Sequence, residues 1–327
     1  MCIRDRYYRF WYSSLPGGGW FRSLKNFLLI FYLLITCSCF AAASEPDRRS
    51  DQISTQSALG FEISTVPVPS GQFISGSNSA ERERAYQLDE AAYGHSTTRK
   101  QKWYENEELH AWRETAAFSI MKTPVTVSMY RHFLQASGHP APVISREAWQ
   151  AQRLRHSYDS TLKYQWKEGN PQVERDQHPV VMVTHTDAER FATWVSEETG
   201  VQWRLPTQHE WEKAARGIAG RTFPWGNAYD PTLLNSHDRG PFATVAVGQF
   251  GQGDSIFGMS DAAGQVFEWT ANLAGNGNQR AIVKGGSWDD KGCGVCRPAA
   301  RHTRPIDVRH ILIGFRLVTE GLKITPK

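Results

Sequence analysis

Two cysteines near the C-terminus have residue types and a spacing that could do chemistry. Cys293 and Cys296 lie three residues apart in the glycine-rich stretch KGGSWDDKGCGVC, residues 284–296. Thiolates are soft metal ligands and the reactive groups of redox pairs, and the same spacing also allows a short disulfide. No helical pattern follows the motif and Pro298 comes two residues after it, so a thioredoxin-type role is not favoured.

The first 43 residues are predicted to be a leader for export. The apolar run FLLIFYLLI (27–35) follows Arg22 and Lys25 and precedes the small residues at 41–43, which is the pattern of a secretory signal peptide. Two alternatives stay open, a membrane anchor that is retained and a lipoprotein signal ending at Cys37. The first twenty residues or so fit no part of a signal peptide and are left out of the fold interpretation.

Removal of this leader changes both the charge and the cysteine content of the chain. Five of the 37 basic and one of the 33 acidic residues lie in 1–43, which leaves 32 of each sign. This balance gives no electrostatic reason to expect nucleic acid as a partner. Only Cys293 and Cys296 remain, and in the periplasm or outside the cell such a pair is expected to form a disulfide or hold a metal.

The elements that position the cysteine loop can be placed from turn residues and helix caps. Residues 44–65 are predicted to be a flexible linker, and an ordered domain is expected over 66–320, starting with a strand within 66–77. Residues 80–110 are expected to form exposed surface with at most a short helix. The stretch beyond residue 217 lacks a regular period and is expected to be a loop-rich core.

Three helices are predicted, each ending at a glycine. They cover residues 126–138, 186–200 and 207–217. The second is expected to begin with a capping box formed by Thr186 and Glu189, and the third with one formed by Thr207 and Glu210.

Several motifs, taken in order along the chain, resemble one known family. RLPTQHEWEKAARG (204–217), FGMSDAAGQVFEW (257–269), VKGGSW (283–288), AARHTRP (299–305) and IGFRLV (313–318) are similar to segments of the formylglycine-generating enzyme, or sulfatase-modifying factor, family. The resemblance runs from about residue 66 to 318. It implies an α+β domain distantly like C-type lectin domains, with short helices, low regular secondary structure and structural calcium. In the true enzymes it also implies a copper-dependent oxidase that uses O₂ to convert a sulfatase cysteine to formylglycine.

The resemblance places the candidate active site in the loop after GGSW. In the copper enzymes one cysteine comes three residues after the serine and a second follows five residues later. Here Asp290 stands three residues after Ser287, Cys293 corresponds to the second cysteine, and Cys296 is extra. One interpretation is a re-spaced Cu(I) or redox pair of Cys293 and Cys296, with Ser287 and Trp288 shaping the pocket. The other is a disulfide, which could not bind copper because ligation needs free thiolates.

Four polar residues are candidates for a calcium site. Asn235 and Glu268 match positions at family calcium sites, whereas Gln265 replaces the usual asparagine of GNVWEW, and Asp238 could compensate. Side-chain oxygens in irregular loops suit Ca²⁺. His185 stands where the family usually packs an aromatic residue, and it is expected to be a hydrogen-bonded packing histidine.

The leading hypothesis is an exported oxidoreductase of the formylglycine-generating type that acts on a protein or peptide thiol. The alternative is a non-catalytic, lectin-like binding or envelope-assembly module, with a Cys293–Cys296 disulfide and an envelope protein or glycan as partner. In both cases the membrane would be reached only through an uncleaved or lipidated leader. A third possibility is an enzyme that uses pocket histidines or carboxylates, and nothing in the sequence singles out its residues.

Overall fold

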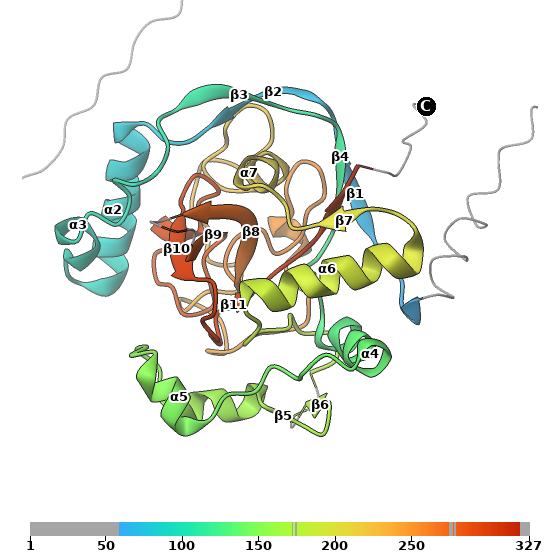
Figure 1. Cartoon of the computed structure of the whole chain (residues 1–327). Coiled ribbons are helices and arrows are strands. Elements are labelled where there is room, and N and C mark those ends of the chain that lie inside the picture. The colour runs from blue at the N-terminus through green and yellow to red at the C-terminus, as the bar shows by residue number, and fades with distance from the viewer. Residues whose placement is uncertain (1–58, 172, 174, 275–276, 278, 321–327) are drawn as a thin grey trace, which may run out of the picture. The chain divides into compact units, whose positions relative to one another are not determined.

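The structure is a computed structural model that describes residues 59–171, 173, 175–274, 277 and 279–320 (Figure 1). The predicted leader, its cleavage site and Cys37 lie outside the described residues. Among the helices within these ranges, none combines the length and the apolar character that crossing a bilayer requires.

Two four-stranded sheets form the centre of the domain (Figure 1). The first sheet is fully antiparallel and has the order β1 (Thr65–Val68), β4 (Phe118–Met121), β12 (Val318–Thr319), β7 (Trp203–Arg204). The second has the order β10 (His302–Pro305), β9 (Arg280–Lys284), β8 (Phe267–Ala274), β11 (Ile313–Gly314), and only β11 pairs in parallel. Two two-stranded antiparallel sheets are also described, β2 (Gly71–Ser75) with β3 (Ala111–Thr115) and β5 (Trp166–Lys167) with β6 (Asn170–Pro171).

Short helices surround the sheets, and the connections between elements are long, which confirms the predicted α+β class (Figure 1). The α-helices are α2 (Ser79–Tyr93), α3 (Thr97–Lys100), α4 (Val127–Ser137), α5 (Arg146–Ala151), α6 (His185–Thr199) and α7 (Gln208–Arg216). The 3₁₀ segments are η1 (Tyr158–Tyr164), η2 (Gly251–Gly253) and η4 (Gly294–Cys296).

The three predicted helices are confirmed as α4, α6 and α7. The capping box of α7 joins Thr207 and Glu210, as predicted. The prediction for α6 was wrong in its first residues, because its capping box joins Thr184 and Asp187 rather than Thr186 and Glu189. An aspartate at the third helical position reaches the N-cap N–H as a glutamate does, so the earlier threonine can start the helix.

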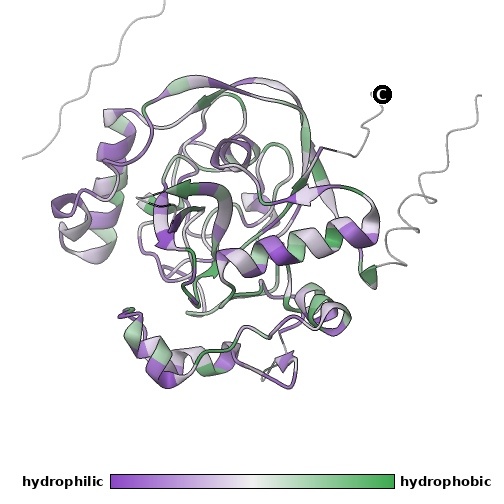
Figure 2. Ribbon diagram, viewed as in Figure 1, coloured by the Kyte–Doolittle hydropathy of each residue, from purple (hydrophilic) through white to green (hydrophobic). Residues whose placement is uncertain are grey.

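Residues 80–110 were expected to be exposed surface with at most a short helix, but α2 is 15 residues long. Asn78 and Glu81 form its capping box, and its buried side chains include Ala85, Tyr86 and Asp89. Figure 2 shows hydrophilic residues around much of its circumference. The apolar period that reveals a helix in a sequence is therefore weak here, because part of the buried face is charged.

Packing also begins before the predicted domain boundary at residue 66. Leu59 is buried, and the ring of Phe61 lies against the rings of His132 and Trp194. The last part of the predicted linker is therefore ordered. Beyond residue 217 the chain is loop-rich, as expected, until β8 begins at Phe267. The eight residues of β8 make it longer than any other described strand.

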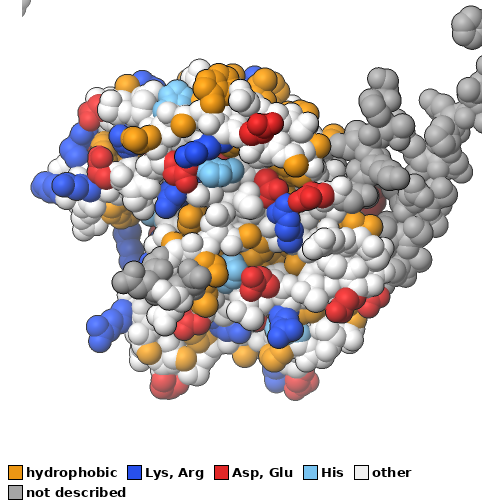
Figure 3. All heavy atoms as spheres, turned by 45° about the horizontal axis from the view of Figure 1, so that its top comes forward, with side chains coloured by type: hydrophobic (Ala, Val, Ile, Leu, Met, Phe, Trp, Pro, Cys, Tyr) orange, Lys and Arg blue, Asp and Glu red, His pale blue; other side chains and the backbone are white. Residues whose placement is uncertain are grey.

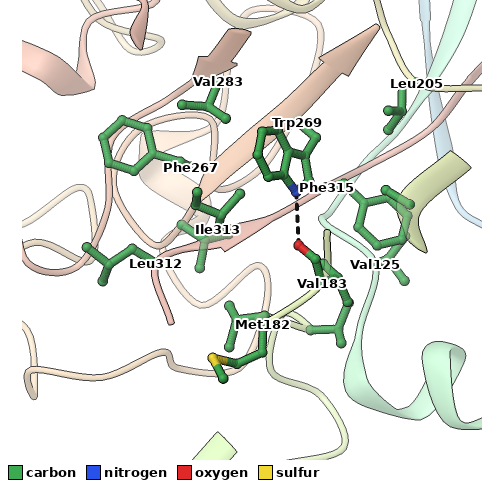
Figure 4. Packing of buried hydrophobic residues seen from close by; sticks show 14 of the residues in the cluster. Val125, Met182, Val183, Leu205, Phe267, Trp269, Val283, Leu312, Ile313 and Phe315 are labelled. Atoms are coloured by element: carbon green, nitrogen blue, oxygen red, sulfur yellow. Dashed lines mark hydrogen bonds between the residues drawn. The ribbon is translucent and has the colours of Figure 1, made fainter. Parts of the chain in front are cut away.

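The core lies between the sheets and α6, with Trp269 of β8 near its centre (Figure 4). The Trp269 indole N–H donates to the carbonyl of Val183 over 3.1 Å. His185 packs edge-to-face on Trp269, with 5.6 Å between ring centroids, and its Nε2 lies 3.0 Å from the Thr270 carbonyl. The predicted role of His185 as a packing histidine is thereby confirmed.

Candidate active site

The candidate site is built around the loop that follows β9, residues 285–297. Gly285 and Gly286 both have positive φ angles, 97° and 72°, which glycine adopts without a steric penalty. A Cβ atom on Gly286 would lie 2.6 Å from the Sγ atom of Cys296. The backbone can therefore pass this close to the cysteine only because no side chain is present.

Cys293 and Cys296 are joined to each other by a disulfide bond, with 4.7 Å between their Cα atoms. Neither residue has any solvent exposure, and the ring that they close contains η4. Two sulfurs bonded to each other present no thiolate to a metal. In this structure the pair restrains the loop.

One side of the loop, which we call the helix-facing side, packs against α2 and the segment after it. The Gly294 N–H and the Tyr104 hydroxyl both donate to the Asp89 carboxylate, over 3.1 Å and 2.5 Å. Arg297 and Glu107 are buried and form an ion pair at 2.5 Å. The polar groups on this side are thus satisfied within the fold.

Asp290 belongs to the other side, which lines a cleft and which we call the cleft-facing side. The backbone N–H and the hydroxyl of Ser287 both donate to Asp290 Oδ2, over 2.8 Å and 2.7 Å. Asp290 Oδ1 has no hydrogen-bond partner among the described residues. One carboxylate oxygen is therefore fixed and the other is free to take up or release a proton.

The cleft has a volume of about 600 Å³ and is formed by segments that are far apart in the sequence. Its walls combine carboxylates, imidazoles, aromatic rings and basic side chains. The lining residues include Tyr93, Trp103, His156, Phe267, Asp289, Asp290, Val295, His302, Arg304 and His310. The disulfide loop contributes Val295 to this wall, and neither sulfur lines it.

The two adjacent aspartates have different protonation behaviour. Burial raises the pKa of Asp290 to about 6, and the negative charge of Asp289 adds to the rise against the hydrogen bonds from Ser287. Burial would also raise the pKa of Asp289, but the hydrogen bond and charge of His156, 3.3 Å away, lower it overall. Neighbouring carboxyls whose pKa values are pushed apart are typical of acid–base sites.

Two histidines of the cleft are neutral imidazoles. Burial lowers the pKa of His302 and of His310 to about 3, and the positive charge of Arg304 acts in the same direction on both. The His302 ring lies edge-to-face against Trp103 and Phe267, at 5.8 Å and 5.9 Å, and its Nε2 is buried without a hydrogen-bond partner. At neutral pH these two imidazoles therefore stay uncharged, and Asp290 is the cleft residue whose raised pKa suits proton transfer near neutral pH.

Comparison with known proteins identifies the family. Residues 51–321 match the family described as "Sulfatase-modifying factor enzyme 1-like domain". This chain belongs to that family. The resemblance that the motifs predicted is confirmed.

Curated relatives of the family carry names of oxidative enzymes and of an inactive one. The chain is 31% identical to the formylglycine-generating enzyme of Mycobacterium tuberculosis over 45% of this chain and 59% of that one. It is 27% identical to hercynine oxygenase of Mycolicibacterium smegmatis, over 79% and 61%. It is 31% identical to the inactive C-alpha-formylglycine-generating enzyme 2 of Bos taurus, over 40% and 45%. The chain thus spans about half the length of the curated relatives it matches.

Solved structures show the same fold at low sequence identity. PvdO from Pseudomonas aeruginosa superposes with a TM-score of 0.57 and 20% identity, over 78% of this chain and 93% of that one. Treponema denticola variable protein 1 gives a TM-score of 0.58 and 15% identity, over 80% and 96%. These likenesses confirm the predicted fold of the sulfatase-modifying factor family.

The four residues predicted to be catalytic lie in one loop, as the resemblance implied, but none of them lines the cleft. Ser287 is buried and holds Asp290, while Cys293 and Cys296 are bonded to each other. Trp288 is 4% exposed and packs edge-to-face on His156, with 5.8 Å between ring centroids. These four side chains pack behind the residues that line the cleft.

The four predicted calcium ligands do not form one group. Both Glu268 oxygens bond to Arg316, at 2.7 Å each, and one also accepts from the Trp211 indole. The Asn235 amide donates to Gln265 Oε1 over 2.8 Å, which uses the extra reach of the glutamine.

Asp238 accepts hydrogen bonds from Tyr229 and from the Gly292 N–H. Asn235 Oδ1 is buried without a partner and is one oxygen available to a cation, whereas calcium takes six to eight. Among the described residues no group of three or more His, Cys, Asp or Glu side chains is placed to hold a metal ion. Calcium stays a prediction of the resemblance.

Sequence reasoning did not find the acid–base residues of the cleft. Asp290 was noted only for replacing a cysteine, although two adjacent aspartates directly after GGSW were a visible signal. His302 and Arg304 lie in AARHTRP, a motif that carried the family resemblance without indicating a role. His156 and His310 have no spacing that relates them to the loop, because the fold alone brings them to the cleft.

Proposed function

We propose that this protein is an exported oxidoreductase-type member of its family that acts on a protein or peptide substrate bound in the cleft, with Asp290 as the acid–base residue. The observation that carries the proposal is the state of Asp290. Its pKa is raised to about 6, its Oδ2 is held by Ser287, and its Oδ1 is free in the cleft. The names of the oxidative relatives support the class of reaction.

The residues present do not fit the copper ion that the family resemblance implies. A Cu(I) site of that type needs two soft thiolates, but here the sulfurs are bonded to each other and fully buried. Asp290, a hard oxygen ligand, stands where the first family cysteine would be. We therefore derive no step through copper.

The step that this chain's own residues supply is a proton transfer. A carboxylate with a pKa near 6 is mostly ionised at pH 7 and can still be reprotonated, which suits a general base that turns over. Asp290 Oδ1 would take the thiol proton of the substrate, which leaves a thiolate. Neutral His302 and His310 would leave that region without added positive charge, and the rings of Trp103 and Phe267 would exclude bulk water. Dioxygen, the oxidant that the resemblance implies and that solution supplies, would take the two electrons of the adjacent C–H bond and, with both protons, become hydrogen peroxide. The thioaldehyde that remains would be hydrolysed by water to the aldehyde and hydrogen sulfide.

The experiment compares two variants of the mature chain, residues 44–327. Oxygen consumption and peptide mass would be followed with cysteine-containing sulfatase-type peptides, for the wild type, Asp290→Asn and the pair Cys293→Ser with Cys296→Ser. Asp159→Asn, an exposed aspartate outside the cleft, is the matched control. The proposal predicts at least a hundredfold loss with Asp290→Asn and retained turnover without the cysteines. Turnover that survives Asp290→Asn but vanishes with the cysteines would overturn it.

A second candidate, the non-catalytic binding or envelope-assembly module, is favoured by the closed Cys293–Cys296 bond. The name of one relative, an inactive C-alpha-formylglycine-generating enzyme, supports the non-catalytic part of this candidate. This candidate predicts no oxygen consumption by the wild type with any tested peptide, together with binding of an envelope protein or glycan that Asp290→Asn leaves unchanged. The same set of proteins therefore separates the two candidates.

A further inference from the structure

Arg304 differs from the buried arginines of the domain in having no carboxylate partner. Arg216, Arg297 and Arg316 are each at most 1% exposed, and each forms an ion pair with a glutamate. Arg304 is partly buried, yet no aspartate or glutamate among the described residues lies within ion-pair distance of it. Its guanidinium donates to the Thr303 carbonyl and lies 5.8 Å from the Phe267 ring centroid. Burial lowers the pKa of Arg304, and the charge of Asp290, which is not within ion-pair distance, offsets this only in part, so an anion bound directly to the guanidinium would still stabilise it.

Arg304 also stands where two cavities meet. It lines the cleft that contains Asp290 and a second cavity of about 670 Å³ beside α5, and Leu154 lines both as well. We call this second cavity the α5 groove. Its apolar lining includes Val143, Ile144, Ala148, Pro305 and Val308. The cleft and the α5 groove thus adjoin at Arg304, which forms no ion pair among the described residues, and the apolar side chains of the groove lie beside it.

Most polar side chains of the α5 groove are already used by the fold; the exception is Asp307, which is exposed and forms no ion pair among the described residues. Gln152 bonds to both the carbonyl and the N–H of Arg309, and the Ser145 hydroxyl accepts from the Ala148 N–H as a helix cap. The Arg309 guanidinium donates to the Met182 carbonyl and to Asp187. A peptide backbone in this groove would find few free partners for its N–H and C=O groups, whereas an aliphatic chain needs none.

We propose that the cleft and the α5 groove bind one ligand, in which an anionic group pairs with Arg304 and an aliphatic chain joined to it lies in the groove. This rests on the proposed function and deepens it: the protein or peptide substrate whose reacting thiol reaches Asp290 would carry the anion and the aliphatic chain as an attached group, and that group rather than the peptide backbone would occupy the groove. The anion supplies the charge that Arg304 lacks, and the chain covers the apolar surface beside α5. Neither contact uses the cysteines.

The test is a binding measurement, so its result does not depend on turnover. Sodium decanoate would be titrated into the wild-type protein by calorimetry, with decanol as the probe that has a chain and no charge and acetate as the probe that has charge and no chain. We expect decanoate to bind at least tenfold more tightly than either. Arg304→Gln should weaken decanoate at least tenfold and leave decanol unchanged, while Arg304→Lys should keep most of the decanoate affinity.

Two further variants test whether the aliphatic chain lies in the α5 groove. Ala148→Trp, which fills the α5 groove, should weaken decanoate and decanol alike. Arg146→Gln changes an exposed arginine of the same helix and should leave both affinities within twofold. Equal decanoate binding by the wild type and Arg304→Gln, or no binding by a folded wild type, would overturn the inference. Tighter binding of an aspartate–leucine peptide than of decanoate would also overturn it, since that result would place a peptide rather than an aliphatic chain in the groove.

The two proposals can fail separately. Decanoate binding that depends on Arg304, together with full turnover by Asp290→Asn, would reject only the proposed acid–base role. Loss of turnover with Asp290→Asn, together with decanoate binding that ignores Arg304, would reject only the ligand assignment.

Discussion

The loop at residues 285–297 has two sides, which differ in whether their polar groups have hydrogen-bond partners within the fold. On the helix-facing side Asp89 accepts two hydrogen bonds and Arg297 is paired with Glu107. On the cleft-facing side Asp290 Oδ1 and His302 Nε2 have no partner among the described residues. The disulfide belongs with the first side, since η4, which lies in the ring that it closes, packs against α2 and neither sulfur lines the cleft.

This difference separates residues that hold the loop from residues that can act on a ligand. Saturated buried groups stabilise the fold and have nothing left to offer a substrate. Unsatisfied groups with displaced pKa values destabilise the folded state and are concentrated at functional sites. Cysteine is a chemically reactive residue type. Cys293 and Cys296, however, are buried and bonded to each other, which places them with the structural residues. Figure 3 shows, for the face it presents, basic and acidic side chains interspersed and hydrophobic side chains in small groups, so surface charge on that face does not mark a site.

The largest expected effect is on the helix-facing side. Glu107→Ala would leave Arg297 buried without its partner, which we expect to lower the free energy of unfolding by about 3–5 kcal/mol. Urea denaturation measures this loss. The matched control is Glu83→Ala, which breaks an exposed pair with Arg99 that solvent screens, and it should change stability only marginally. Equal effects of the two substitutions would remove the contrast on which the comparison rests.

The next effect concerns the disulfide itself. Replacing Cys293 and Cys296 together by serine should lower the free energy of unfolding by about 2 kcal/mol, because a four-residue loop gains little entropy when it is opened. Decanoate binding in the cleft should persist, since neither sulfur lines it. A folded double variant that no longer binds decanoate would show that the cysteines act on the cleft-facing side.

A smaller effect is expected in the pH dependence of stability. The folded-state pKa of His302 is lowered to about 3, so the unfolded chain binds more protons between pH 6.5 and pH 3, and stability is lost as the pH falls through this window. One histidine then contributes about 1.4 kcal/mol of loss at pH 5.5. In His302→Gln the difference in unfolding free energy between pH 7.5 and pH 5.5 should shrink by this amount. An unchanged difference would mean that His302 is solvated.

The smallest expected effect comes from a substitution that raises the free energy of unfolding instead of lowering it. The pKa of Asp290 is raised from 3.8 to about 6, so the folded chain binds more protons in this interval and stability falls as the pH rises through it. Asp290→Asn removes that penalty at pH 7.5 but weakens the hydrogen bonds from Ser287, for a net gain of about 1 kcal/mol.

The gain should be absent at pH 4, where the carboxyl is largely protonated in the folded chain. Asp159→Asn, which alters an exposed carboxylate, should show neither effect. A loss of stability in Asp290→Asn at pH 7.5 would place Asp290 with the structural residues and remove the distinction between the two sides of the loop.

The sequence predicted the family, the α+β class and three helices because their signals are local. The Thr207–Glu210 capping box and the Gly138 and Gly200 helix ends are each formed by neighbouring residues, so they can be read without knowing the fold. Helix α2 was underestimated because its buried face includes Glu81 and Asp89, whose partners lie far along the chain.

The cleft could not be predicted, because its residues have no common pattern in the sequence. His156, Asp290, His302 and His310 meet only after β9, β10 and the segment after α5 are assembled. Their properties depend on that assembly as well, since burial and the nearby charges set the pKa values of Asp290 and His302. The four-residue cysteine pattern, by contrast, was visible at once, but it did not reveal whether the sulfurs face a cleft or each other.

The most direct test of the central claim is the state of Cys293 and Cys296 in protein produced by secretion into an oxidising compartment. Residues 44–327 would be purified without reductant, alkylated and measured by mass, before and after anaerobic addition of Cu(I). The account predicts that neither cysteine is alkylated, that each becomes labelled only after reduction, and that the unreduced protein retains no copper. Free thiols that Cu(I) protects from alkylation would contradict it and return the two cysteines to the centre of the chemistry.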